Sequence, residues 1–342
     1  MAPFSKQTRQ TDMTAPLTAT ARSYSNIAFI KYWGNRDHAL RLPANGSISM
    51  NLDGLETVTT VRFEPGAPHD RLVLNGEEQT GPALDRVSQH LDRLRALAGV
   101  AYRAHVTSHN NFPTGTGIAS SASAFSALTV AATAALGLDL DERTLTILAR
   151  QGSGSASRSV PGGFVEWYAA DTSDESYAES IAPPDHWDLV DLVAIVSREH
   201  KAVGSTGGHA LAPTSPLQAA RVADTPRRLD LCRRAILERD FEALAAVVEQ
   251  DTVMMHGVMM SSEPALIYWQ PPTLRIMSAV QRWRADGIPA CFTIDAGPNV
   301  HVITTSEHAA HLRAALAELD GVADVLKATP GGPAHLLDSP TV

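Results

Sequence analysis

The chain has 342 residues, with 28 Lys and Arg against 37 Asp and Glu, which gives a formal net charge of −9 at pH 7. This acidic balance argues against nonspecific binding to nucleic acids or anionic membranes, because both are polyanions. Hydrophobic residues make up 44% of the sequence, enough to bury a sizeable core and to exclude disorder of the whole chain. No apolar run approaches the roughly 18–20 residues of a membrane span. We therefore expect a globular, cytoplasmic protein.

Residues 1–22 are rich in Thr, Ala and Gln and show no hydrophobic period, so we expect a disordered tail. A strand is predicted from Tyr24 onward, ending before Gly34-Asn35. Further strands are predicted at 58–63, 71–74, 102–107 and 164–169, and helices at 85–98, 120–136 and 140–150.

In the second half, the long amphipathic segment 227–250 predicts two helices that meet near Asp240-Phe241. Gly297-Pro298-Asn299 predicts a hairpin turn between strands at 290–294 and 300–304. Other strands are expected at 189–196 and 323–326, and helices at 273–287 and 308–319. Strands and helices mixed with hairpin signals favour an α+β fold. We expect two domains, at 23–190 and 191–342.

The segment from Asn110 to Ser121 runs from a strand through a Pro/Gly loop into an alanine-rich helix. Small residues let backbone N–H groups approach an anion, and a helix N-terminus adds partial positive charge. Ser120 and Ser121 supply hydroxyls for phosphate or magnesium. The loop has neither the Gly-Lys-Ser/Thr of a Walker loop nor the third glycine of a dinucleotide fingerprint. The alternative is a helix of small residues packed tightly on a sheet.

Gly152 to Ser159 alternates serines with glycines before Arg158. Flexible backbone donors, two hydroxyls and a guanidinium predict a pocket for a carboxylate or phosphate. The alternative is a linker, but strong elements flank the segment closely, which favours a shaped loop.

Two single residues have ambiguous surroundings. Asp295 ends a strand before a Gly-Pro turn, and is either a turn cap or a catalytic carboxylate. Lys31 is one of only four lysines and lies in an apolar stretch. Its side chain either reaches the surface or pairs with a catalytic carboxylate in a low-dielectric site.

Together, four motifs resemble one family. They are Asn-Ile-Ala-Phe-Ile-Lys-Tyr-Trp-Gly at 26–34, Pro-Thr-Gly-Thr-Gly-Ile-Ala-Ser-Ser at 113–121, Gly-Ser-Gly-Ser-Ala-Ser-Arg-Ser at 152–159 and Asp-Ala-Gly-Pro-Asn at 295–299. They look like those of the mevalonate diphosphate decarboxylases, members of the GHMP-kinase superfamily. The resemblance implies a domain like ribosomal protein S5 domain 2, a ferredoxin-like domain, an active site in the cleft between them, and a homodimer.

The resemblance also implies roles for individual residues. Arg158 matches the arginine that holds the substrate C1 carboxylate, Asp295 the aspartate beside the 3-hydroxyl, and Lys31 the lysine that bridges to the phosphates. ATP and Mg²⁺ would bind at the glycine loop, with Ser121 also contacting the metal. The expected ATP-binding residues are Asn110, Gly115, Gly117, Ala119, Ser120 and Ser121, and those expected to bind phosphorylated mevalonate are Tyr32, Asn35, Arg86, Ser153, Ser155, Ser205 and Thr206.

The implied reaction is ATP-dependent phosphorylation of the 3-hydroxyl, followed by loss of phosphate and CO₂. A kinase that stops after phosphorylation is the nearest alternative, and a catalytically silent metabolite-binding relative is another. The presence of both Lys31 and Asp295 favours complete decarboxylation.

One position departs from the family pattern. Where the family has a second lysine that contacts the substrate diphosphate, this chain has Asn35. A cation about 4 Å from a phosphate contributes up to about 4 kcal/mol at an effective dielectric of 20. We therefore hypothesise that the preferred substrate is 5-phosphomevalonate, giving isopentenyl phosphate. The alternative is that Arg36 or another basic group covers the diphosphate.

Overall fold

The structure, a computed structural model, describes residues 17–112, 120–199 and 203–338. Its strands are β1 (Thr18–Ile30), β2 (Asn35–Asp37), β3 (Leu42–Pro43), β4 (Ser47–Glu64), β5 (Arg71–Leu74), β6 (Glu77–Gln79), β7 (Arg103–Asn110), β8 (Phe164–Trp167), β9 (Ala178–Ala182), β10 (Leu189–Ile195), β11 (Ala290–Thr293), β12 (Val300–Thr305), β13 (Asp324–Pro330) and β14 (His335–Leu337). Its helices are α1 (Pro82–Ala98), α2 (Ser120–Ala135), α3 (Glu142–Gly152), α4 (Ser205–Leu211), α5 (Gln218–Glu238), α6 (Phe241–Met260), α7 (Pro271–Ala285) and α8 (Ser306–Ala317), with short 3₁₀ helices η1 (Gly154–Ser159), η2 (Pro184–His186) and η3 (Ala212–Thr214).

A single sheet of twelve strands runs through both halves of the chain. Its main path is β11-β12-β10-β13-β4-β7-β5-β6, and the pairing of β13 with β4 joins the two halves. The β5–β7 pair is parallel, whereas β10 pairs antiparallel with both β12 and β13. The predicted α+β class is confirmed, and the predicted division into two domains stays a prediction.

β1 begins earlier than the sequence predicts. Its backbone pairs antiparallel with β4 from Thr18↔Arg62 to Ile30↔Ile48, and β14 pairs along its other edge at residues 20–22. Ala21 is fully buried. The expected disordered tail is therefore wrong for residues 18–22, because a strand paired on both edges needs no amphipathic alternation to be stable. Residues 1–16 lie outside the described part of the chain.

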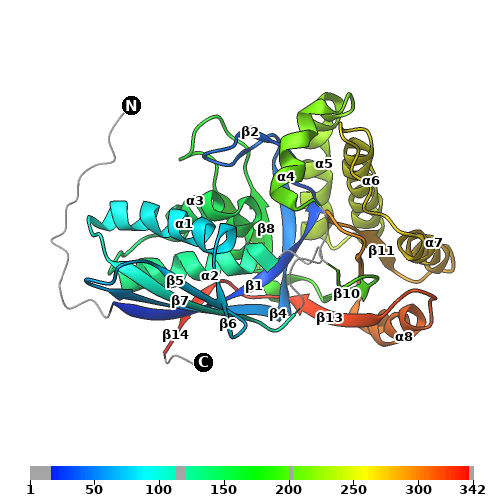
Figure 1. Cartoon of the computed structure of the whole chain (residues 1–342). Helices are drawn as coiled ribbons and strands as arrows, with labels where there is room; N and C mark the ends of the chain where they lie inside the picture. Colours follow the sequence, from blue (N-terminus) through cyan, green and yellow to red (C-terminus); the bar gives the residue numbers. More distant parts are fainter. Residues whose placement is uncertain (1–16, 113–119, 200–202, 339–342) are drawn as a thin grey trace.

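The helices form separate layers on the two halves of the sheet (Figure 1). α2 packs directly on β1 and β4, with α1 and α3 beside it, while α6 and α7 pack on β11 and α8 on β10. The predicted pair of helices at 227–250 is confirmed as α5 and α6. The break falls where Asp240 caps α6, since its carboxylate accepts from the Ala243 N–H at 3.0 Å.

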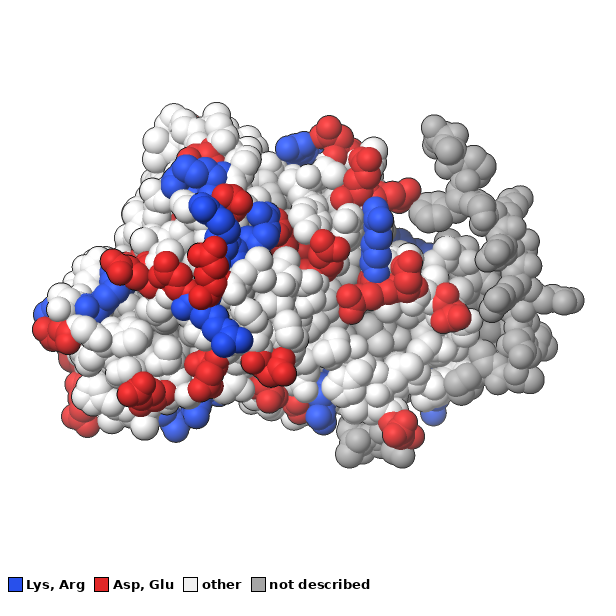
Figure 2. All heavy atoms as spheres, turned by 180° about the vertical axis from the view of Figure 1, so that it is seen from behind, with Lys and Arg blue, Asp and Glu red and all other residues white. Residues whose placement is uncertain are grey.

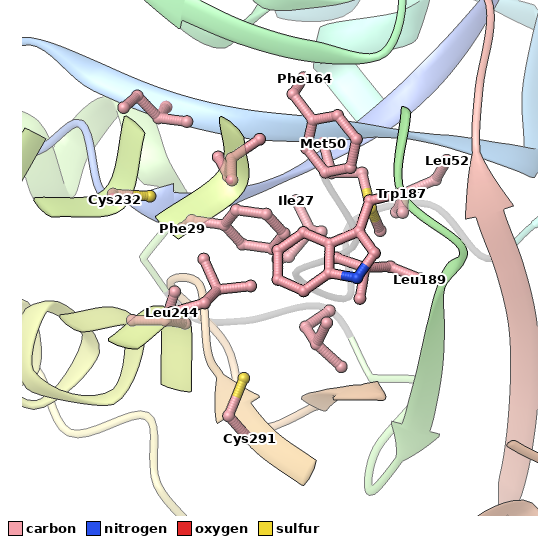
Figure 3. Packing of buried hydrophobic residues seen from close by; sticks show 14 of the residues in the cluster. Ile27, Phe29, Met50, Leu52, Phe164, Trp187, Leu189, Cys232, Leu244 and Cys291 are labelled. Atoms are coloured by element: carbon pink, nitrogen blue, oxygen red, sulfur yellow. The ribbon is translucent and has the colours of Figure 1, made fainter. Parts of the chain in front are cut away.

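A buried cluster ties the two halves together (Figure 3). Phe29 of β1 lies in the same cluster as Leu244 of α6 and the two cysteines, Cys232 and Cys291. Both cysteines are free and buried, and burial raises the pKa of each thiol. This shared core fixes the end of β1 relative to the second-half helices, which positions the site described next.

Within the described residues, no helix is both long and apolar enough to cross a membrane. On the face that Figure 2 shows, Lys and Arg side chains are interspersed with Asp and Glu, without a continuous basic patch.

Candidate active site

A cavity of about 280 Å³ lies where segments from both halves of the chain converge. The end of β1, the start of α2 and η1 supply one side, and α4 and the residues after β11 supply the other. Eleven of the residues predicted for the site line it: Lys31, Tyr32, Arg86, Ser120, Ser121, Ser153, Ser155, Arg158, Ser205, Thr206 and Asp295.

Lys31 and Asp295, which both line this cavity, form a buried ion pair. The Lys31 Nζ donates to Asp295 Oδ1 at 2.5 Å, and the two side chains are 2% and 25% exposed. Burial lowers the pKa of Lys31. Burial opposes ionisation of Asp295 as well, but the Lys31 ammonium outweighs it, and the pKa of the carboxyl lies below its usual value. Asp295 is therefore an anion at neutral pH, held in its charged form by the adjacent ammonium.

Arg158 lies beside this pair in η1 and is almost fully buried. Its Nη1 donates to Ser47 Oγ at 2.5 Å and its Nη2 to Asn26 Oδ1 at 3.2 Å. Burial lowers the pKa of Arg158 to about 10, against the opposing effect of Asp295. The guanidinium thus stays charged at neutral pH, with its orientation fixed by two neutral acceptors that leave its charge available to a ligand.

Four serine hydroxyls line the cavity on the first-half side. Ser120 and Ser121 open α2, and Ser121 Oγ lies 3.1 Å from Ser153 Oγ. Hydroxyls at a helix N-terminus suit an anionic ligand such as a phosphate. Among the described residues, no group of three or more His, Cys, Asp or Glu could hold a metal ion. The expected ATP contacts Gly115, Gly117 and Ala119 lie outside the described residues.

Tyr32 and His209 also line the cavity. Their rings stack with centroids 4.1 Å apart, and a Cβ on Gly154 would lie 2.6 Å from the Tyr32 ring, so any side chain there would force the ring to shift. The His209 Nδ1 accepts from the Gly34 N–H at 3.0 Å, which leaves Nε2 to carry the hydrogen of the neutral imidazole. The Tyr32 hydroxyl donates to Asn35 Oδ1.

Two predicted residues are not among those that line the cavity, Asn35 and Asn110. Asn35 reaches it only through the Tyr32 hydroxyl. Asn110 ends β7 and accepts from the Thr57 hydroxyl at 2.5 Å. Arg36 points elsewhere, because its Nη1 pairs with Asp171 at 2.5 Å on the surface, with side chains 47% and 88% exposed.

Sequence reasoning missed several lining residues, notably Asn26, Arg41 and His209. Arg41 lies before β3 in a left-handed conformation with φ 50°, and its Nε donates to the Gln151 carbonyl at 3.1 Å. Nothing local marks Arg41 or His209 as site residues. Asn26 stands within a motif of the site, and its polar amide among apolar strand residues was a usable signal.

Comparisons with known sequences agree with this geometry. A profile of the diphosphomevalonate decarboxylase-like N-terminal domain matches residues 23–178, and one of the mevalonate 5-diphosphate decarboxylase C-terminal domain matches residues 191–331. The chain belongs to the mevalonate diphosphate decarboxylase family. Diphosphomevalonate decarboxylase of Ganoderma lucidum is 38% identical over 315 residues, 85% of this chain and 79% of that protein. Phosphomevalonate decarboxylase of Haloferax volcanii is 35% identical over 324 residues, 94% of this chain and 98% of that protein.

Solved structures of the family share the fold. The complex of MDDEF with MVAPP, AMPPCP and magnesium has a TM-score of 0.89 at 35% identity, covering 94% of this chain and 99% of that one. Mevalonate diphosphate decarboxylase from Staphylococcus aureus has a TM-score of 0.88 at 34% identity, covering 94% and 98%. As a family member the chain is an enzyme, a decarboxylase of phosphorylated mevalonate, and ATP and magnesium are the family's co-substrate and metal.

Proposed function

We propose that this decarboxylase acts on 5-phosphomevalonate, coupling ATP hydrolysis to the formation of isopentenyl phosphate and CO₂. The observation that carries the choice of substrate is the neutral Asn35 at the position where the family resemblance leads one to expect a second lysine. Its side chain accepts a hydrogen bond from the hydroxyl of Tyr32, a residue that lines the cavity, and adds no positive charge there.

The reaction begins at the Lys31–Asp295 pair. Asp295 orients the 3-hydroxyl and accepts its proton, while O3 attacks the γ-phosphorus of ATP and ADP leaves. Lys31 lies 2.5 Å from the carboxylate, so its ammonium can stabilise the charge on the phosphoryl group in transit. Bound magnesium would neutralise further phosphate charge, with Ser121 as the hydroxyl we assign to it.

The second step breaks the C3–O3 and C1–C2 bonds and forms the C2=C3 double bond and the second C=O bond of CO₂. The C3–O3 bond breaks and phosphate leaves with its electron pair, while the C1–C2 bond breaks and its electrons form the C2=C3 double bond, releasing CO₂. Arg158 is the group we assign to the C1 carboxylate. Since Ser47 and Asn26 fix its guanidinium, the carboxylate can be aligned with the leaving phosphate.

The residues around Tyr32 account for the proposed choice of substrate. A second phosphate adds negative charge that must be neutralised when the substrate leaves water. Tyr32 and His209 line the cavity with neutral groups, Asn35 accepts from the Tyr32 hydroxyl without adding a charge, and Arg36 is engaged with Asp171 at the surface. The similarity over 94% of this chain to a protein named phosphomevalonate decarboxylase also supports the monophosphate.

Arg41 is the cation that could reverse this choice. It lines the cavity, and among the described residues its guanidinium donates from Nε to the Gln151 carbonyl, with no acceptor shown for its two Nη atoms. A diphosphate-specific enzyme would use this guanidinium in place of the missing lysine. The two possibilities make opposite predictions for variants at positions 35 and 41.

The test compares kcat/KM for 5-phosphomevalonate and 5-diphosphomevalonate, with ADP and CO₂ measured in the same reaction. We expect the monophosphate to be preferred and one CO₂ to form per ADP. The variant Asn35→Lys should raise kcat/KM for the diphosphate, and Arg41→Met should leave the preference of the parent enzyme unchanged. A strong preference for diphosphate that Arg41→Met abolishes would reject the proposal, and ADP without CO₂ would identify a kinase.

A further inference from the structure

The main chain of Lys31 is fixed by side chains and not by the sheet. Pairing of β1 with β4 ends at Ile30, so no strand of the described part of the chain pairs with the N–H or C=O of the next residue. The Lys31 N–H donates to Asp251 Oδ2 at 2.7 Å. The Lys31 carbonyl accepts from Arg221 Nη2 at 2.7 Å and from Asn45 Nδ2 at 2.8 Å. We call Asp251, Arg221 and Asn45 the Lys31 clamp.

The clamp joins distant parts of the chain in a fully buried network. Asp251 lies on α6, 220 residues beyond Lys31, and is not exposed at all. Arg228 Nε donates to its other oxygen at 2.8 Å, and the Arg221 guanidinium lies 3.7 Å away. Arg221 also donates to Asn45 Oδ1 at 3.1 Å. Each charge in the network therefore has an opposite charge and a hydrogen-bond partner, the condition under which buried ions persist.

We propose that Asp251 is a positioning residue for the decarboxylation, and that it acts by fixing the main chain of Lys31 so that its ammonium meets Asp295 at the transferred phosphoryl group. The inference rests on the Lys31–Asp295 site but not on the choice between mono- and diphosphate. A buried carboxylate that binds a backbone N–H defines both the position and the direction of that residue, because the hydrogen bond is short and directional.

The same carboxylate has an electrostatic effect on Lys31. The charged and titratable groups that face the ammonium are Asp295 after β11, Arg158 in η1, and Asp251 and His256 on α6. Burial lowers the pKa of Lys31, and the negative charge of Asp251 acts in the opposite direction. Removal of that charge should therefore let the ammonium deprotonate at lower pH, an effect that a purely structural role would not produce.

The decisive variant is Asp251→Asn in the full chain. We expect kcat to fall about a hundred-fold, as for a displacement of about 1 Å at a reacting group, with KM for ATP little changed. The alkaline limb of the kcat–pH profile should move to lower pH. A second variant, Arg221→Lys, keeps the positive charge but loses the guanidinium that donates to both the Lys31 carbonyl and Asn45. It should lower kcat, but it should move the alkaline limb of the kcat–pH profile less than Asp251→Asn does.

The matched control is Glu166→Gln. Glu166 is also buried, 2% exposed, and accepts two hydrogen bonds of 2.8 Å from Arg233 of α5. It is not among the described residues that line the cavity. It should lower the midpoint of thermal unfolding while leaving kcat per folded enzyme and the pH profile unchanged. If Asp251→Asn behaves like this control, or if both clamp variants keep full kcat per folded enzyme, Asp251 is only structural. If both clamp variants lose activity while the alkaline limb of the kcat–pH profile stays in place, the inferred effect of the Asp251 charge on Lys31 is wrong.

Discussion

The Lys31–Asp295 pair should couple far more strongly than a surface pair of the same length. Its Nζ–Oδ1 distance is 2.5 Å, and two unit charges at that separation attract by roughly 6–7 kcal/mol at an effective dielectric of about 20. Desolvation cancels part of this attraction, and loss of one partner of a buried pair typically costs about 3–5 kcal/mol. Because the Asp295 side chain is 25% exposed, we expect a coupling energy near the lower value, about 3 kcal/mol.

The chain supplies its own control. Arg36 and Asp171 are also 2.5 Å apart, but their side chains are 47% and 88% exposed. Exposed pairs usually contribute about 0.2–1 kcal/mol. With equal distances, the difference between the two coupling energies reflects burial together with the change of cation from lysine to arginine.

The assay is a pair of double-mutant cycles by urea unfolding, using Lys31→Met with Asp295→Asn, and Arg36→Met with Asp171→Asn. Added salt at about 1 M should weaken the surface coupling and leave the buried one nearly intact, because the Debye length falls to about 3 Å. Steady-state assays of Asp295→Asn should show ADP and CO₂ formation falling together by about 10²–10³-fold. A Lys31–Asp295 coupling below 1 kcal/mol, or one as salt-sensitive as the surface pair, would refute the electrostatic reasoning.

Three further outcomes are expected. Burial holds the pKa of His90 at about 3 and of His256 at about 4. Below a pH of about 6.5 the unfolded chain therefore binds protons at these histidines that the folded chain does not. The unfolding free energy should fall as the pH is lowered from about 6.5 to about 4, and His90→Gln should reduce that slope by about 1.4 kcal/mol per pH unit. A slope unchanged by that variant would contradict the assignment. Gly154→Ala should lower kcat/KM, because its Cβ would lie 2.6 Å from the Tyr32 ring; wild-type kinetics would show that the ring moves freely. Two variants separate the roles of the two His209 nitrogens. His209→Asn can still accept from the Gly34 N–H but loses the hydrogen at Nε2, whereas His209→Gln keeps a donor near the Nε2 position. If the Nε2 hydrogen contacts the 5-phosphate, KM should rise more in His209→Asn; a larger rise in His209→Gln would show that His209 only supports the backbone.

The sequence pattern alone predicted the helices and strands whose ends are marked by nearby turn or capping residues. The helix predicted at 120–136 is α2 (Ser120–Ala135), and the hairpin predicted around the Gly297-Pro298-Asn299 turn is β11 paired with β12. The two-helix reading of 227–250 was correct because an N-capping aspartate needs only neighbouring N–H groups. The motifs likewise identified eleven residues that line the cavity, since each motif gathers small or charged residues within a few positions.

Elements that depend on distant partners were not predictable in this way. The start of β1 at Thr18 depends on pairing with β4 and β14, and α4 contains two glycines, which disfavour a helix. The two-domain division, the homodimer and the cytoplasmic location stay predictions, because a single folded chain does not test them.

By itself, the sequence determined which chemical groups this protein can bring to a reaction: a rare lysine, an aspartate after a strand, an arginine and serines among glycines. Only the tertiary structure decided that Lys31 and Asp295, 264 positions apart, meet at 2.5 Å, that Arg36 is paired at the surface, and that Asp251 holds the Lys31 main chain. The physical reason is range. Side-chain periodicity and turn preferences act over a few residues, whereas hydrogen bonds and ion pairs at a buried site depend on which distant surfaces exclude water together.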